Sequence, residues 1–148
     1  MIDIVILIAC ALCGYALGKY LEKRVKRKGN FYGDLTRYIA LLKVNIERRQ
    51  LELGKFNEEF GTNCSAVFRD YLQSSKFKVS LTTAQKENVA AFFNNLGCVS
   101  SQELIKHIEY YDHIFATDNR QIEVEVSKAS IYVKLGILLG VMVGIVLM

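Results

Sequence analysis

The sequence predicts an all-α protein, an antiparallel helical bundle flanked by an N-terminal and a C-terminal transmembrane helix. Three observations indicate this class. Apolar runs occupy residues 2–18 and 135–148, and the second contains no charged residue. Between them, apolar side chains recur at three- and four-residue steps, as they do on amphipathic helices. The chain also has no proline, a residue that breaks helices.

Four segments are expected in chain order. The first apolar run rises about 25 Å as a helix, near the lower limit for crossing a hydrocarbon core of about 30 Å. The second run is shorter, and it reaches across if the helix begins near Ala129 and Lys134 snorkels towards the headgroups. The segments are an N-terminal transmembrane helix at 1–20, a basic juxtamembrane segment at 21–30, a cytoplasmic helical bundle at 31–128 and a C-terminal transmembrane helix at 129–148.

Basic residues are concentrated directly after the first apolar run. Residues 19–28 carry a local net charge of +5, whereas the whole chain carries +4. A cleavable signal peptide, the rival interpretation of the first run, would carry its positive charge before the apolar stretch, where this chain has Asp3. The bases of the segment, against the single acid Glu22, are Lys19, Lys23, Arg24, Lys26, Arg27 and Lys28.

The distribution of Lys and Arg predicts the orientation. Three further bases, Arg120, Lys128 and Lys134, precede the second span, and neither outer end carries one. By the positive-inside rule, the central segment then lies in the cytoplasm and both termini lie outside. Nucleic-acid binding is the alternative role for the basic segment, but its position beside a span favours lipid headgroups. We therefore expect membrane lipid as a partner, and no nucleic acid.

Small residues recur every fourth position in both apolar runs. Such spacing lets helix backbones approach closely, which drives association where no hydrophobic effect operates. The simpler alternative is that glycine is common in membrane helices. The pattern does not say whether the partner is the other span or another subunit. The positions are Gly136, Gly140 and Gly144 in the second run, and Cys10, Gly14 and Gly18 in the first.

The central segment predicts several helices. One apolar stripe comprises Leu35, Ile39, Leu42, Ile46 and Leu53, and shorter helices are expected around residues 56–60 and 67–72. Thr82 and Gln85 form a capping box at the start of the next helix. That helix is expected to bury Val89, Phe92, Phe93 and Leu96 and to end at a left-handed Gly97.

A second capping box at residues 100–103 begins the last helix of the central segment. The apolar rhythm beyond it predicts one helix without a breaker until Gly136, running from the bundle into the membrane. The alternating residues Gln121–Val126 are also compatible with a strand, although no partner strand is evident.

The sequence contains no recognisable catalytic motif, and we expect no cofactor, no metal site and no enzyme activity. Cys10 and Cys13 have C-x-x-C spacing, but inside an apolar span they are better explained as small membrane residues than as a redox pair. His107 and His113 fall on different faces of a helix. The candidates for partner binding are Arg37, Arg48 and Arg49, of which the last two would alternatively complement a helix dipole.

Two short motifs carry a resemblance to a known family. The first is Leu135-Gly136-x-Leu138-x-Gly140, followed by Leu147-Met148 at the end. The second is Phe92-x-x-x-Leu96-Gly97, which stands before a serine-capped helix. Both motifs resemble the stage III sporulation protein AB family. The order of spans, basic segment and bundle is similar too. Members have a Gly- or Pro-containing turn after the first helix of the bundle, whereas Arg48–Leu53 has neither.

The resemblance implies a role in endospore-forming bacteria, in the channel complex between mother cell and forespore. Its bundle would be similar to cytoplasmic domains of the platform protein of type II secretion and type IV pilus systems. The implied partners are a cytoplasmic ATPase, sporulation protein AA, and other membrane channel subunits. The implied location is the mother-cell membrane facing the forespore. Separately from the resemblance, a homo-oligomer is a further expectation. A holin-like pore former is the alternative, although it would not need a capped bundle.

Overall fold

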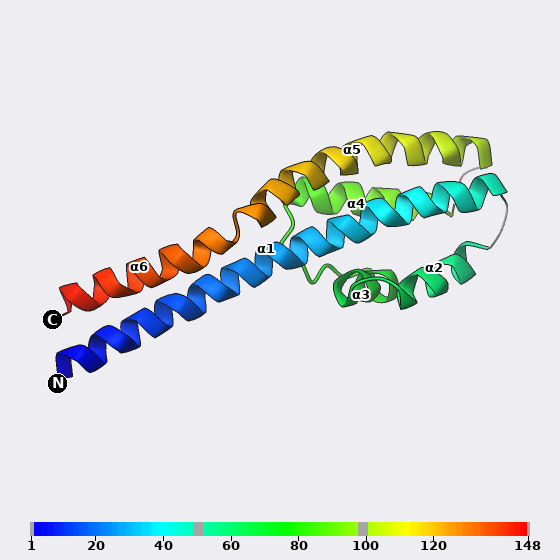
Figure 1. Cartoon of the computed structure of the whole chain (residues 1–148). Helices are drawn as coiled ribbons and strands as arrows, with labels where there is room; N and C mark the ends of the chain where they lie inside the picture. Colours follow the sequence, from blue (N-terminus) through cyan, green and yellow to red (C-terminus); the bar gives the residue numbers. More distant parts are fainter. Residues whose placement is uncertain (1, 49–51, 98–100, 148) are drawn as a thin grey trace. The chain divides into compact units, whose positions relative to one another are not determined.

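The protein is described by a computed structural model that covers residues 2–48, 52–97 and 101–147. Within these ranges the chain is helical and contains no strand, which confirms the predicted all-α class. The helices, labelled in Figure 1, are α1 (Ile2–Arg48), α2 (Leu53–Thr62), α3 (Ala66–Ser74), α4 (Thr83–Asn95), α5 (Ser101–Ser127) and α6 (Ser130–Val146).

The helices contribute to two compact units. The terminal unit consists of Met1–Lys26 and Glu123–Met148, and the bundle unit consists of Arg27–Ile122. Helices α1 and α5 each contribute one part to each unit. The membrane and cytoplasmic roles that the sequence assigns to its four segments stay predictions.

The core of the bundle unit contains the first three residues of the predicted apolar stripe, whereas Ile46 is half-buried and Leu53 belongs to α2 rather than to α1. Leu35, Ile39 and Leu42 are at most 1% exposed, because residues three or four positions apart share one face of a helix. Aromatic rings surround this stripe. The ring of Tyr38 lies 5.2–5.8 Å from four others, a spacing at which aromatic pairs attract beyond their area burial: Phe56, Phe60, Phe68 and Phe93.

The capping box of α4 is confirmed, whereas the expected end of that helix is wrong. The Thr82 hydroxyl accepts from the Gln85 backbone, and the Gln85 side chain accepts from the Thr82 N–H. Among the described glycines none has a positive φ, so Gly97 is not left-handed. The helix instead tightens, because the Leu96 N–H donates to the Phe93 carbonyl, a bond of the 3₁₀ type. The second capping box involves Ser100, outside the described residues.

The last two helices correct one further expectation. Residues 121–126 are helical, so the strand alternative is excluded. The helix is nevertheless interrupted at Lys128 and Ala129, well before Gly136. Across the break, backbone bonds reach back three residues rather than four, as from Ala129 to Val126 and from Tyr132 to Ala129. No residue of low helix propensity marks this position, and Ala129 is fully buried.

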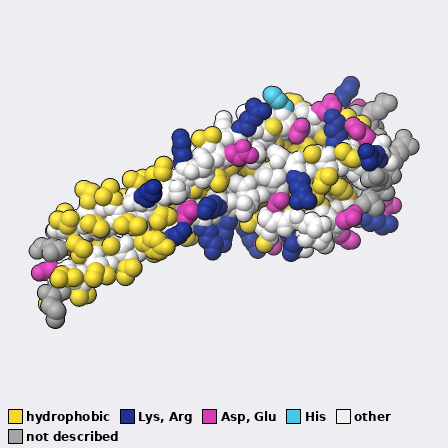
Figure 2. All heavy atoms as spheres, viewed as in Figure 1, with side chains coloured by type: hydrophobic (Ala, Val, Ile, Leu, Met, Phe, Trp, Pro, Cys, Tyr) yellow, Lys and Arg dark blue, Asp and Glu magenta, His cyan; other side chains and the backbone are white. Residues whose placement is uncertain are grey.

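The terminal unit has the length and surface of membrane-spanning helices. Helix α1 is long and apolar enough to cross a membrane, and only 11% of its most apolar window is buried. Helix α6 has 17 residues, and the bent pair of α5 and α6 satisfies the same criterion when taken as one span. Apolar side chains gather on the surface of this unit (Figure 2). Water-exposed proteins rarely carry so extensive an apolar surface, which indicates a membrane location.

Candidate packing and docking surfaces

Helices α1 and α6 touch backbone to backbone at their glycines. A methyl group built on Gly14 would collide with the carbonyl oxygen of Gly136, and one on Gly140 with that of Cys10. On Gly18 it would lie 2.6 Å from the carbonyl oxygen of Tyr132. Since the obstacles are backbone atoms rather than flexible side-chain ends, only glycine permits this approach.

The order of these contacts describes an antiparallel pair in register. Each four-residue step forward along α1, from Cys10 to Gly14, matches a four-residue step backward along α6, from Gly140 to Gly136. At the far end, a methyl group on Gly144 would lie 3.2 Å from the Cα of Leu7, a tight but looser contact. The two small-residue faces therefore meet each other within one chain. Their part in assembly with other subunits stays a prediction.

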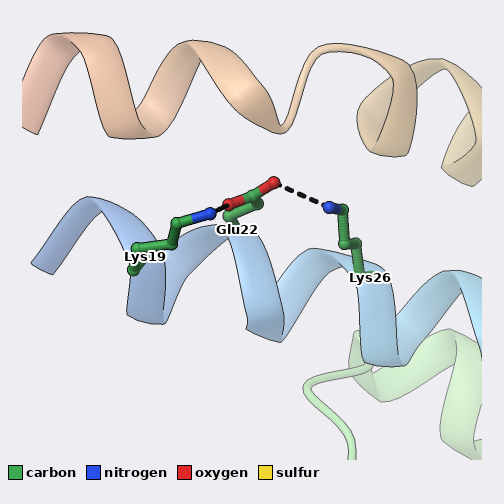
Figure 3. Close-up of polar contacts among 3 residues, drawn as sticks. All are labelled: Lys19, Glu22 and Lys26. Atoms are coloured by element: carbon green, nitrogen blue, oxygen red, sulfur yellow. Dashed lines mark hydrogen bonds and ion pairs between the residues drawn. The ribbon is translucent and has the colours of Figure 1, made fainter. Parts of the chain in front are cut away.

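Glu22 extends the small-residue face of α1 by one more four-residue step. It is only 7% exposed, and its carboxylate accepts hydrogen bonds from Lys19 Nζ at 2.9 Å and Lys26 Nζ at 2.7 Å (Figure 3). These bonds, the one from Lys26 first, hold the pKa of Glu22 below its ordinary value. The residue therefore remains a carboxylate, and two of the six bases of the juxtamembrane segment are paired with it. In the sequence, Glu22 stands out only as the acid among six bases, although its four-residue spacing from Gly18 places it on the same helix face.

The other juxtamembrane bases lie mostly on the surface. Lys23, Arg24 and Arg27 are exposed, whereas Lys28 is half-buried. Exposed bases next to an apolar span fit the expected contact with lipid headgroups, which stays a prediction.

The arginines predicted to bind a partner lie in the bundle unit. Arg37 is exposed, its guanidinium carbon lies 5.8 Å from the centre of the Phe60 ring, and its Nη1 makes a long bond of 3.4 Å to the carbonyl of Asn63. Arg48 is exposed at the end of α1. Arg49 lies outside the described residues. Arg37 and Arg48 are eleven residues apart, about three helical turns, so they share one face of α1.

The bundle unit also holds a buried polar link between α1 and α5. The fully buried Tyr32 donates its hydroxyl proton to Asp118 Oδ2 at 3.2 Å. Burial, followed by the nearby carboxylate, raises the pKa of Tyr32 far above its ordinary value, so the phenol stays protonated and remains a donor.

Cysteine and histidine side chains are the groups that would suggest redox chemistry or metal binding. Cys10, Cys13 and Cys64 are free thiols, the first half-buried and the second exposed. His107 stacks on Phe92 with 5.9 Å between ring centres. Across the ranges that the structure describes, no three His, Cys, Asp or Glu side chains gather as metal ligands would.

The model of the stage III sporulation protein AB family matches residues 48–148, about two thirds of the chain. The chain belongs to this family. The match begins at the end of α1 and contains both motifs on which the resemblance was based. Comparisons with curated proteins and with solved structures gave no match.

Membership of the stage III sporulation protein AB family implies a role in stage III of sporulation. Its members are components of the sporulation channel, and the family is not a known enzyme family. The candidate membrane helices of the terminal unit agree with a membrane location for such a component.

Proposed function

We propose that this chain is a membrane platform in the channel complex between mother cell and forespore, and that its bundle unit docks a cytoplasmic ATPase. The family match over residues 48–148 carries the proposal, because it covers most of the bundle unit and all of α6. Within the bundle unit, an aromatic core around Tyr38 supports a folded cytoplasmic module. A holin-like pore former needs spans and a basic segment, but it has no use for such a module.

The proposed orientation places both termini outside and the bundle unit in the cytoplasm. The exposed bases after the first span support it by the positive-inside rule. Cysteines introduced one at a time into a cysteine-free background report it, with Lys86→Cys on the bundle unit and a cysteine appended after Met148. An impermeant thiol reagent applied to intact cells should label the appended cysteine and miss position 86. Labelling at position 86 would reverse the orientation.

The ATPase partner is tested with the full chain in lipid nanodiscs. Purified sporulation protein AA should bind these nanodiscs saturably and should not bind empty nanodiscs of the same lipid. Nanodiscs that carry an unrelated two-span protein with a basic flank control for electrostatic attraction to the membrane. Absence of saturable binding, with or without nucleotide, would contradict the platform role.

A further inference from the structure

The face of α1 that carries Arg37 and Arg48 also carries two exposed aliphatic side chains. Leu41 and Val44 lie four and seven residues after Arg37, so the helical repeat places both between the arginines. They are 42% and 40% exposed. Neighbouring Gly33 would meet nothing within 4 Å if it carried a methyl group, so this end of the face is open as well.

Exposure of large apolar side chains is unusual in the bundle unit. Among its described residues, the large apolar side chains that are exposed are Leu41, Val44 and Tyr110. Two of these three are adjacent on one helix face. Single exposed apolar residues are ordinary on protein surfaces, whereas adjacent ones flanked by charges are typical of binding surfaces.

A groove between α1 and α2 accompanies the aliphatic pair. It has a volume of about 260 Å³, and the nearly buried rings of Phe56 and Phe60 from α2 line it together with Leu41 and Val44. Arg37 lies at this groove, held by the Phe60 ring and the Asn63 carbonyl. A guanidinium that is already positioned loses less conformational freedom when it pairs with a carboxylate.

The charges around the groove indicate what it would bind. Arg37 and Arg48 stand about 16 Å apart along the helix axis, at the two ends of the aliphatic pair. Glu59, next to Phe60 on α2, also lines the groove and disfavours an acidic ligand residue beside it. Glu47 precedes Arg48 and is turned about 100° away from it around α1. The complementary ligand therefore has aliphatic residues in its centre and an acid near each end.

We propose that this surface, the α1–α2 docking face of Arg37, Leu41, Val44, Arg48, Phe56 and Phe60, binds an amphipathic helix of a cytoplasmic partner whose acidic residues are spaced about three turns apart. The identity of the partner rests on the proposed function, which makes it the ATPase. The chemistry follows the helix-in-groove mode, in which apolar anchors fill a groove and charges set register and orientation.

The test measures binding of purified sporulation protein AA to the full chain in nanodiscs. Arg37→Glu with Arg48→Glu should weaken binding at least about tenfold, because like charges would face each other across the interface. Leu41→Ser with Val44→Ser should weaken it about tenfold by removing the apolar anchors. Salt should weaken wild-type binding and that of the serine variant, and it should strengthen binding of the glutamate variant, because it screens the like-charge repulsion.

Matched controls separate this face from general effects. Lys76→Glu with Lys86→Glu changes the net charge equally at two exposed positions elsewhere, and Tyr110→Ser removes the third exposed apolar side chain. Both controls should bind as the wild type does. Circular dichroism melting reports folding, and the single variant Arg48→Glu keeps the test valid if Arg37→Glu perturbs the groove.

The outcomes distinguish the inference from the proposed function. Wild-type protein that binds no ATPase would contradict the platform role. Wild-type protein that binds it, with folded variants of the docking face binding equally well, would overturn this inference and leave the platform role standing. Variants that change only the self-association of the chain would also overturn it, because the face would then join two copies.

Discussion

Replacing the glycines between α1 and α6 with alanine should separate the two helices in a defined rank order. A methyl group on Gly14, Gly136 or Gly140 would collide with a backbone carbonyl of the facing helix. On Gly18 it would lie 2.6 Å from a carbonyl oxygen, whereas ordinary van der Waals contact begins at 3.4 Å. On Gly144 the nearest atom is 3.2 Å away. The first three substitutions should therefore perturb most, Gly18→Ala somewhat less, and Gly144→Ala least.

The size of the effect follows from these distances. To relieve the contact at Gly18, the two helices must move apart by roughly 0.8 Å. A gap of about 0.5–1 Å loses a quarter to a half of the dispersion energy of each atomic contact that it opens. Overpacking of this kind typically costs about 1–3 kcal/mol. In a bilayer no hydrophobic effect compensates, because lipid tails are as apolar as the side chains.

The assay is a dipolar EPR measurement on the full chain in nanodiscs, with spin labels at Leu12 of α1 and Leu138 of α6, both exposed. Gly14→Ala and Gly140→Ala should lengthen or broaden the distance distribution. Gly33→Ala, whose methyl group meets nothing, is the control and should leave it unchanged. An unchanged distribution for Gly14→Ala and Gly140→Ala together would refute the close backbone contact.

Three further predictions concern single side chains. Glu22→Gln should remove a pH-dependent contribution to thermal stability. The pKa of Glu22 in the folded protein lies below the ordinary 4.5, so the wild type keeps this contribution above pH 4.5 and loses it as the pH falls through the folded pKa. The melting temperature of the variant should lack this pH dependence. Gly33→Ala should raise the free energy of unfolding by up to about 1 kcal/mol in denaturant titrations, because alanine is the better helix former; a loss of stability would contradict the open space there. Tyr32→Phe should lower the free energy of unfolding by about 1 kcal/mol, since Asp118 loses a hydrogen bond, and a neutral result would mean that water replaces the hydroxyl.

The helices and the core of the bundle unit were predictable because burial follows the helical repeat. Leu35, Ile39 and Leu42 of the predicted stripe are buried. Ile46 is only half-buried, and Leu53 lies beyond the end of α1. The Thr82 capping box was predictable for a similar reason, since both partners lie within one turn. Patterns local in sequence thus carry most of the secondary structure.

Features set by tertiary packing were not predictable in this way. The break at Lys128 and Ala129 contains neither glycine nor proline, so propensity alone favours a continuous helix. Gly97 was expected to be left-handed from its residue type, but a tighter last turn ends α4 before it. Leu41 and Val44 lie off the buried stripe, and no sequence pattern marks two off-stripe aliphatics as a pair beside a groove.

The small-residue faces of α1 and α6 were predictable only in part. Four-residue spacing predicted a packing face on each apolar run, but it could not identify the partner or distinguish one glycine from the next. The structure pairs the two faces within the chain and makes Gly144 the loosest of the contacts. That difference depends on the backbone of the opposite helix, which a single segment does not encode.

The proposed role, a membrane platform that docks an ATPase through the α1–α2 docking face, is tested by photo-crosslinking in sporulating cells. A photoreactive amino acid replaces Val44 on the docking face or, as the matched exposed control, Lys86 on α4. Position 44 should crosslink to sporulation protein AA in the membrane fraction, and position 86 should not. No ATPase crosslink from position 44, or equal crosslinks from both positions, would contradict docking through this face.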